Sequence, residues 1–190
     1  MTHLDRHAYA DLPDSALIKA IAKGEAAALD SFYARYGPAV LNFLFARLGN
    51  RQQAEEVLQD VMLAVWRGAS AFRGDSRVLT WILTIARNRA INAYRKYSPN
   101  VIAFEDELDM QGDDTGPLER VERLNLQSSV REAIELLPAH HREVLTLIFF
   151  NQLSGEEAAS VLGVSVGTVK SRLFRAKENL RRLLQSEELS

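Results

Sequence analysis

The fold is decided by residues 154–176, which read SGEEAASVLGVSVGTVKSRLFRA. Ser154 is followed three residues later by Glu157, the spacing of a capping box, which predicts the start of a short helix. Gly163 then supplies a tight turn, because glycine readily adopts the left-handed backbone that ends helices. Ser165 stands where an N-cap residue would begin a second, longer helix. The pattern therefore predicts a helix-turn-helix.

The second of these helices has two chemically different sides. On a wheel of 100° per residue, apolar side chains form one stripe and hydroxyl and basic side chains form another. The apolar stripe contains Val166, Val169, Leu173, Ala176, Leu180 and Leu183. The polar arc contains Thr168, Ser171, Arg172, Arg175 and Arg182. Such an arc suits the DNA major groove and its phosphates. The alternative interpretation is a basic surface helix of an ordinary bundle.

Working outward, helical periodicity covers two regions, from about Asp14 to Tyr97 and from about Leu124 to Leu184. The sequence between them is rich in Pro, Gly and acidic residues, which predicts a linker. We therefore predict an all-α protein of two small helical domains joined by an extended acidic linker. Within the first region, Gly37-Pro38 is expected to separate two helices. Asn50, three residues before Gln53, is expected to cap the next one.

Charge is unevenly distributed along the chain. The formal net charge is −2, from 23 Lys+Arg and 25 Asp+Glu. Residues 87–96 and 170–182 are nevertheless strongly basic, whereas residues 105–114 carry six acids and no base. Blocks of opposite sign are typical of two surfaces for a polyanion joined by a segment that repels it. Solvated helix faces and an acidic linker are an equally weighted alternative on charge alone.

A possible nucleic-acid face runs along the helix predicted over residues 80–96. One side of this helix gathers an aromatic ring, hydroxyl and amide groups and a guanidinium. Its members are Trp81, Thr84, Asn88, Asn92 and Arg95, flanked by Arg87 and Lys96. Stacking by an aromatic ring, hydrogen bonding by amides and positive charge are the means by which proteins hold bases and phosphates. A buried tryptophan with incidental amides is the alternative.

A second stripe lies on the helix predicted over about 53–67. The side that is expected to be buried contains Val57, Leu58, Val61 and Val65. The opposite stripe contains Glu56, Gln59, Asp60 and Leu63. A leucine among exposed acids is unusual for a merely solvated face, so this stripe is a candidate contact for a partner helix.

Composition excludes several other classes of function. The chain has no cysteine, which excludes disulfides, thiolate zinc sites and a cysteine nucleophile. The histidine pairs at 3/7 and 140/141 lack acids at metal-ligand spacing, so we predict no metal site. No catalytic constellation or cofactor motif stands out, and we predict no catalysis and no cofactor.

The sequence shows no targeting or membrane segment. The first thirty residues contain several acids and no continuous apolar stretch, unlike a secretory signal. The longest apolar run, Val144–Phe150, is far shorter than the roughly 20 residues that span a bilayer. We therefore expect a cytoplasmic protein without membrane insertion.

Several ordered motifs resemble the bacterial extracytoplasmic-function (ECF, group 4) RNA polymerase sigma factors of the sigma-70 family. In the C-terminal half these are residues 137–145 (LPAHHREVL), 153–159 (LSGEEAA) and 163–176 (GVSVGTVKSRLFRA). In the N-terminal half they are residues 54–60 (AEEVLQD), 72–76 (FRGDS), 80–82 (TWI) and 85–88 (IARN). The resemblance covers most of residues 14–186.

The resemblance implies a function and a role for each part of the chain. Residues 10–97 would form a sigma-2 domain, 98–123 the acidic linker and 124–186 a sigma-4 domain. Core polymerase would bind Glu56, Gln59, Asp60 and Leu63. The melted −10 element would contact Phe72, Arg73, Ser76, Trp81, Asn88, Asn92, Arg95 and Lys96. The −35 duplex would contact Ser165, Thr168, Lys170, Ser171, Arg172 and Arg175. Core RNA polymerase, promoter DNA and an anti-sigma factor are the implied partners.

Two rival functions remain open at this stage. A helix-turn-helix repressor or activator acting without polymerase would bind duplex promoter DNA tightly on its own and would need no polymerase-facing stripe. A sigma mimic that titrates a sigma inhibitor could lose its DNA-facing residues. Those residues are present here, as Asn88, Arg95 and Arg175 illustrate.

Overall fold

The computed structural model describes residues 9–97 and 126–187. The first part contains α2 (Asp14–Ala22), α3 (Ala26–Leu48), α4 (Arg51–Gly68), the short 3-10 turn η1 (Ala69–Ala71) and α5 (Val78–Tyr97). The second contains α6 (Leu126–Leu136), α7 (Ala139–Leu145), the π-helical turn η3 (Thr146–Phe150), α8 (Gly155–Leu162) and α9 (Val166–Glu187). No strand occurs in either range, which confirms the all-α prediction. The predicted linker, 98–123, lies outside the described residues.

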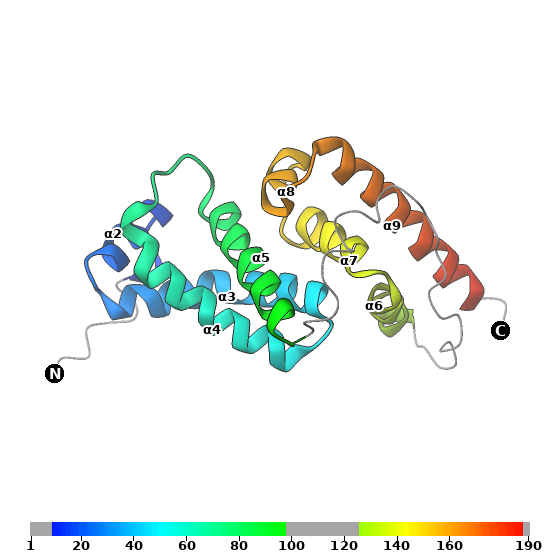
Figure 1. Cartoon of the computed structure of the whole chain (residues 1–190), viewed down its shortest axis with the longest axis horizontal. Coiled ribbons are helices and arrows are strands. Elements are labelled where there is room, and N and C mark those ends of the chain that lie inside the picture. Colours follow the sequence, from blue (N-terminus) through cyan, green and yellow to red (C-terminus); the bar gives the residue numbers. More distant parts are fainter. Residues whose placement is uncertain (1–8, 98–125, 188–190) are drawn as a thin grey trace.

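The N-terminal domain is built around α3, which packs against α2, α4 and α5 (Figure 1). Its fully buried side chains include Leu17, Phe32, Phe43, Val61 and Ile82. Asn50 caps α4 as predicted, because its side chain accepts a hydrogen bond from the Gln53 backbone N–H at 3.0 Å. The α4 side that was expected to be buried is buried, and this orients the opposite stripe toward solvent.

The prediction that Gly37-Pro38 separates two helices is wrong. The structure has one helix, α3, with Pro38 inside it. Proline removes one helical hydrogen bond and crowds the preceding turn. The buried side of the helix nevertheless continues through the proline, from Phe32 and Tyr36 to Val40 and Phe43. Burial of these side chains against three neighbouring helices outweighs the local cost, since tertiary packing routinely overrides intrinsic propensity.

The C-terminal domain contains the predicted helix-turn-helix. Ser154 and Glu157 form a complete capping box at the start of α8, with each side chain bonded to the other residue's backbone N–H. Gly163 ends α8 with a φ of 65°, in the left-handed region. Ser165 begins α9, and its Oγ accepts from the Thr168 backbone N–H at 3.0 Å. The turn and caps predicted from residues 154–176 are therefore confirmed.

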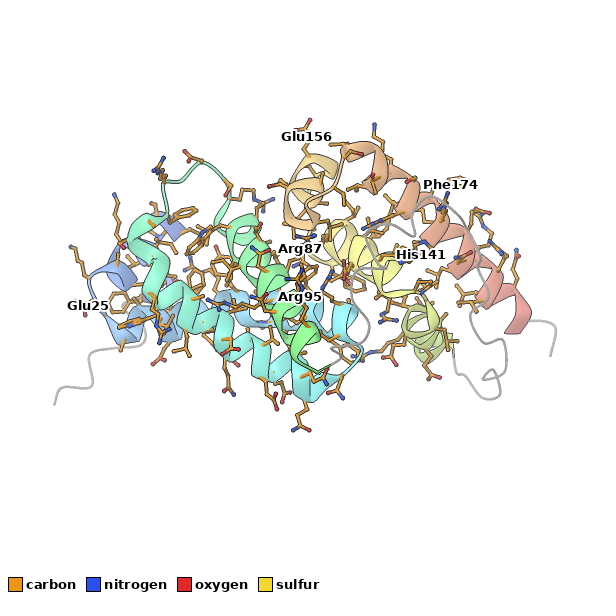
Figure 2. The ribbon with its side chains drawn as sticks, in the orientation of Figure 1. Glu25, Arg87, Arg95, His141, Glu156 and Phe174 are labelled. Atoms are coloured by element: carbon orange, nitrogen blue, oxygen red, sulfur yellow. The ribbon has the colours of Figure 1, made fainter. Side chains whose placement is uncertain are left out.

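The two domains pack directly against each other. α3 contacts α7, and α5 contacts α8, so the two helical groups lie side by side in Figure 1. The side chain of Arg87 lies at this junction (Figure 2). A β-carbon added to Gly163 would lie 3.2 Å from Arg87 Nη1, which shows how closely α5 approaches the turn of the helix-turn-helix. No sequence pattern predicted this contact between the domains.

Candidate protein and nucleic-acid interfaces

The stripe on α4 is presented to solvent. Glu56, Gln59, Asp60 and Leu63 are all exposed, and the Leu63 side chain is 50% exposed. The stripe combines an apolar centre with surrounding carboxylates and an amide on a rigid helix. An exposed apolar group with a polar rim is the composition of a protein-binding surface. The sequence prediction of an exposed stripe on this helix is confirmed, whereas its partner is not identified by the geometry alone.

Aromatic residues join the loop before α5 to the helix itself. The rings of Phe72 and Trp81 lie 4.8 Å apart between centroids at an interplanar angle of 45°. Both side chains are half-buried, and Arg73 and Ser76 in the intervening loop are exposed. The ring contact fixes the loop to the first turn of α5, and so holds these exposed polar groups near the aromatic pair.

The face of α5 predicted to hold nucleic acid is only partly open. Asn88, Asn92 and Arg95 are exposed along successive turns of the helix, whereas Trp81 packs against the core. The side chain of Lys96 lies outside the described residues. The three exposed side chains offer amide and guanidinium donors in a row, the groups that bind base edges and phosphates.

The first turns of α9 carry the candidate duplex-reading residues. Ser165, Lys170, Ser171 and Arg175 are exposed, and Thr168 is half-buried. Three hydroxyls are already used locally: Ser165 Oγ lies 2.9 Å from Thr168 Oγ1, and Ser171 Oγ donates to the Thr168 carbonyl at 3.0 Å. Ser165 therefore supports the start of the helix, while Lys170 and Arg175 are the accessible cations.

Arg172 differs from the other candidate DNA contacts on α9 because it is only 6% exposed. On the helical wheel it lies about 60° from Val169, a member of the buried stripe. Its side chain therefore packs beside the core stripe rather than projecting into solvent. In this structure the Arg172 side chain is therefore not accessible to DNA.

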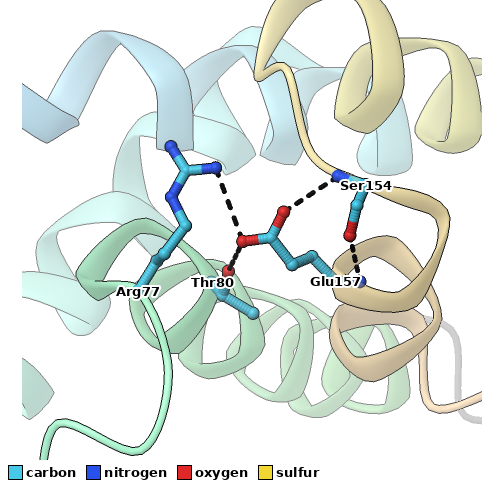
Figure 3. Close-up of polar contacts among 4 residues, drawn as sticks. All are labelled: Arg77, Thr80, Ser154 and Glu157. Carbon is cyan, nitrogen blue, oxygen red and sulfur yellow. Dashed lines mark hydrogen bonds and ion pairs between the residues drawn. The ribbon is translucent and has the colours of Figure 1, made fainter.

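A polar cluster that the sequence did not predict joins α8 to α5 (Figure 3). Besides closing its capping box, Glu157 accepts a hydrogen bond from Thr80 Oγ1 at 3.3 Å and forms an ion pair with Arg77 Nη1 at 3.4 Å. Thr80 lies in the contact between α5 and α8 and is only 4% exposed. Sequence reasoning identified Glu157 only as a capping residue, because its other two partners lie 77 and 80 residues away.

The electrostatics of Glu157 predict an acid-sensitive contribution to stability. The hydrogen bond from the Ser154 backbone N–H, with the nearby Arg77 charge, lowers the pKa of Glu157 below its ordinary 4.5, although burial opposes this. A carboxyl with a lowered pKa stabilises the fold above its unfolded pKa, and this contribution is lost as the pH falls through the folded value.

We therefore expect Glu157→Gln to reduce the free energy of unfolding at neutral pH by about 0.5–1 kcal/mol. Glutamine retains much of the capping geometry but not the charge. The difference from the unsubstituted protein should shrink as the pH falls below the ordinary carboxyl pKa and vanish below the lowered pKa of folded Glu157, as measured by urea unfolding at several pH values. The control is Glu156→Gln, an exposed position one residue earlier. A difference that persists unchanged into acid would contradict the assignment.

Exposed aromatic side chains form a further feature that the sequence did not single out. Phe149, Phe150 and Phe174 are 54%, 65% and 68% exposed. Lys177 Nζ lies 5.2 Å from the centroid of the Phe149 ring, and Lys177 follows Phe174 by one helical turn on α9. Phe174 lies on the side of α9 away from the N-terminal domain (Figure 2). Exposed aromatic residues of this density are enriched at protein-binding surfaces.

The described parts of the chain contain no group of three His, Asp or Glu side chains placed to hold a metal ion. Within those same parts, no helix is both long enough and apolar enough to cross a membrane.

Comparison with known proteins identifies the family to which the chain belongs. Residues 32–99 match Sigma-70 region 2 and residues 127–180 match Sigma-70, region 4. The RNA polymerase sigma-H factor of Pseudomonas aeruginosa is 32% identical over 181 residues, covering 90% of this chain and 94% of the relative. The ECF RNA polymerase sigma-E factor of Escherichia coli K12 is 33% identical over 183 residues, covering 92% and 95%.

Solved structures agree with these sequence matches. The sigma factor RpoE of Bartonella quintana, in complex with the anti-sigma factor NepR, matches with a TM-score of 0.63 at 28% identity, covering 82% of this chain and 96% of that one. CnrH, in complex with the cytosolic domain of CnrY, matches with a TM-score of 0.62 at 26% identity, covering 92% and 98%. The chain thus belongs to the ECF RNA polymerase sigma factors of the sigma-70 family, and it directs transcription initiation at promoters together with RNA polymerase.

Proposed function

We propose that the two domains divide promoter recognition between them. The N-terminal domain (10–97) binds core RNA polymerase and holds the melted −10 element, and the C-terminal domain (124–186) reads the −35 duplex. The acidic segment 98–123 connects them. The observation that carries this proposal is the presence, in one chain and in the family's order, of an exposed protein-binding stripe, an exposed amide and guanidinium face, and a capped helix-turn-helix.

On α4, we assign polymerase binding to Glu56, Gln59, Asp60 and Leu63. Leu63 supplies apolar area at the centre of the contact, and the surrounding acids select a basic partner surface. Because the opposite side of α4 is buried in the core, the stripe is held rigid before the partner arrives. A rigid surface loses little conformational entropy on binding, which favours affinity.

On the −10 side, we assign the contacts to Phe72, Arg73, Ser76, Trp81, Asn88, Asn92, Arg95 and Lys96. Melting a duplex costs a few kcal/mol for each unstacked base. Stacking on an aromatic ring and hydrogen bonds to base edges recover that cost for a single-stranded base. The Phe72–Trp81 pair offers the aromatic surface, and the row of exposed α5 side chains offers the donors.

On the −35 side, we assign the contacts to Ser165, Thr168, Lys170, Ser171, Arg172 and Arg175. The start of α9 would enter the major groove, as recognition helices do. Lys170 and Arg175 are exposed on the surface of α9. Arg172 becomes available only if its buried side chain changes rotamer.

Partners beyond polymerase and DNA follow from the family. One of the solved structural neighbours, the sigma factor RpoE of Bartonella quintana, is in complex with the anti-sigma factor NepR. We infer that this chain too binds an anti-sigma factor, that it acts in the cytoplasm with the transcription machinery, and that it catalyses no reaction itself. Since the chain lacks cysteine, any thiol-based redox sensing would belong to the partner.

The decisive experiment is run-off transcription with core RNA polymerase and a pool of genomic promoter fragments. We expect transcripts from a subset of promoters only when the protein is present. Tight duplex binding by the protein alone, with no polymerase-dependent transcript, would instead identify a repressor or activator. Binding to a sigma inhibitor without either activity would identify a sigma mimic.

Arg175→Ala is expected to weaken −35 binding by holoenzyme by about 1–3 kcal/mol if the side chain contacts a base. If the contact is to phosphate, the slope of log affinity against log salt should fall by about one. Filter binding of holoenzyme to promoter fragments across a salt series measures both. Arg131→Ala, at an exposed position on α6, is the control. Unchanged affinity and slope would refute the recognition-helix assignment.

Asn88→Ala is expected to impair promoter opening more than initial duplex binding. The exposed Asn88 amide would bond to a base only after that base has left the stack. Permanganate reactivity of unpaired thymines measures opening, and filter binding measures the closed complex. Asn42→Ala removes another exposed amide, from α3, and should change neither. An equal loss in both assays would count against base capture by Asn88.

A further inference from the structure

Arg182 is an exposed cation on the polar arc of α9, beyond the residues assigned to the −35 duplex. It follows Arg175 by seven residues, so at about 100° per residue the two side chains lie within about 20° of each other around the helix. At about 1.5 Å per residue, Arg182 lies about 10 Å farther along the axis. Arg182 therefore faces the same way as the exposed Arg175, nearer the C-terminal end of α9.

The Arg182 guanidinium is held by an amide on the same helix. Its Nη2 donates to Asn179 Oδ1 at 2.7 Å, across one turn of α9. The bond uses one of the N–H donors of the guanidinium fork and leaves the rest of the fork to a ligand. Because the amide is neutral, the bond orients the positive charge without cancelling it. The neighbouring Arg181 differs, since its guanidinium pairs with the Glu178 carboxylate.

The Asn179 amide is in turn attached to the interior of the domain. Its Nδ2 lies 3.4 Å from Nδ1 of His141 on α7. His141 is only 2% exposed. The ring of His140 packs edge-on against the His141 ring, with centroids 4.3 Å apart. The His141 ring is therefore held firmly, and it provides a fixed point for the half-buried Asn179 side chain.

Hydrogen-bond chemistry determines which way the Asn179 amide points. A guanidinium only donates, so the amide atom that faces Arg182 must be the oxygen. The amide nitrogen then faces His141, and because this nitrogen also only donates, His141 Nδ1 must accept. In this arrangement the His141 ring is neutral and carries its proton on Nε2. The three side chains thus form one series of hydrogen bonds, from a buried ring to an exposed guanidinium.

The position of Arg182 along α9 suits a phosphate better than a base. Recognition helices contact base edges with their N-terminal residues, and the major groove is only about 12 Å wide. Arg182 lies about 25 Å along the helix from Ser165. With the first turns of α9 in the groove, Arg182 would therefore lie over the backbone of one DNA strand. The guanidinium fork matches the geometry of phosphate oxygens, which it binds with two parallel hydrogen bonds.

We propose that Arg182 binds a backbone phosphate at the edge of the −35 duplex, and that Asn179, anchored by His141, is the residue that positions it. The proposal rests on the proposed function, in which α9 reads this duplex. Phosphate contacts fix the register and orientation of a helix on DNA but carry no sequence information. A guanidinium that is already oriented also loses less conformational entropy on binding. Arg182 therefore adds affinity without sequence preference, and Asn179 acts through it.

Arg182→Ala is expected to remove one phosphate contact. The slope of log affinity against log salt should fall by about 0.9, so holoenzyme should bind a promoter fragment about eightfold more weakly at about 0.1 M salt, with the difference vanishing near 1 M. Filter binding across a salt series measures both quantities. The loss should be equal on a fragment with a scrambled −35 element, because phosphates carry no sequence. Arg181→Ala, which removes the neighbouring charge from another side of α9, is the matched control and should leave the slope unchanged.

Asn179→Ala tests the positioning role. Because the Arg182 charge is retained, affinity should fall about two- to tenfold while the salt slope stays unchanged. The double variant Asn179→Ala/Arg182→Ala should lose no more than Arg182→Ala alone, whereas a merely structural role for Asn179 would add to the loss. His141→Leu removes the anchor and should act as Asn179→Ala does. Circular dichroism and the urea midpoint verify that each variant is folded.

The outcomes distinguish a failed phosphate contact from a failed recognition helix. Unchanged affinity and slope for Arg182→Ala, with weakened binding by Arg175→Ala, would overturn the phosphate contact and leave the recognition helix standing. Additive losses in the double variant would overturn the positioning role of Asn179. If neither Arg175→Ala nor Arg182→Ala changed binding, α9 would not read the −35 duplex, and the proposed function of this domain would fail together with the inference.

Discussion

Phe43→Ala is expected to lower the free energy of unfolding by about 3–5 kcal/mol. Phe43 is fully buried in the C-terminal part of α3, and this helix packs against both α4 and α5. Removing its ring forfeits the transfer of a large apolar surface from water and leaves a cavity that the surrounding helices fill only in part. Since single domains are stable by only about 5–15 kcal/mol, this one change would remove a large share of the total.

Urea unfolding followed by far-UV circular dichroism measures the loss. Phe150→Ala is the matched control, because the same atoms are deleted from a side chain that is 65% exposed. That substitution should change stability by no more than about 0.5 kcal/mol. If the two variants were equally stable, α3 would not be the centre of the core.

Leu63→Asp should weaken binding to core RNA polymerase by roughly 30- to 1000-fold. Leu63 is the apolar centre of the α4 stripe, and an aspartate there would place an unpaired charge in the middle of the desolvated contact. Its side chain is half exposed in the free protein, so the substitution leaves the core untouched and the fold should persist.

Fluorescence anisotropy of labelled protein titrated with core polymerase provides the measurement. Leu136→Asp introduces the same change at a 40% exposed leucine on α6 and should leave the affinity within about twofold. Equal affinity of the Leu63 variant and the unsubstituted protein would mean that polymerase binds another surface. The exposed aromatic group around Phe149 and Phe174 would then be the next candidate.

Most of the helix boundaries could be predicted because their signals are local. Asn50 and Ser165 cap helices through hydrogen bonds to a backbone N–H three residues later, and Ser154 with Glu157 forms the predicted box. The wrong prediction was the break at Pro38. The Gly37-Pro38 pair is a local signal for a helix break. Packing against three neighbouring helices nevertheless keeps α3 continuous, and such packing cannot be predicted from local sequence.

For the candidate binding residues too, the sequence predicted exposure correctly in most cases and failed where tertiary packing decides. The α4 stripe and Asn88, Asn92 and Arg95 are exposed as the helical wheel predicts. Arg172 is buried although its residue type suggested a surface cation, because it borders the stripe that packs into the domain. The functional roles of all these residues stay predictions until the experiments above are done.

By itself the sequence determined the all-α class, the helix-turn-helix and the chemistry of the exposed faces, since each depends on residues within a few turns of one another. Only the tertiary structure revealed that the two domains close on each other. The contacts responsible join residues 96 positions apart in Arg47–Glu143 and 77 apart in Thr80–Glu157. Such pairs carry no periodic or local signal, because their partners are far apart in the chain and meet only in the folded structure.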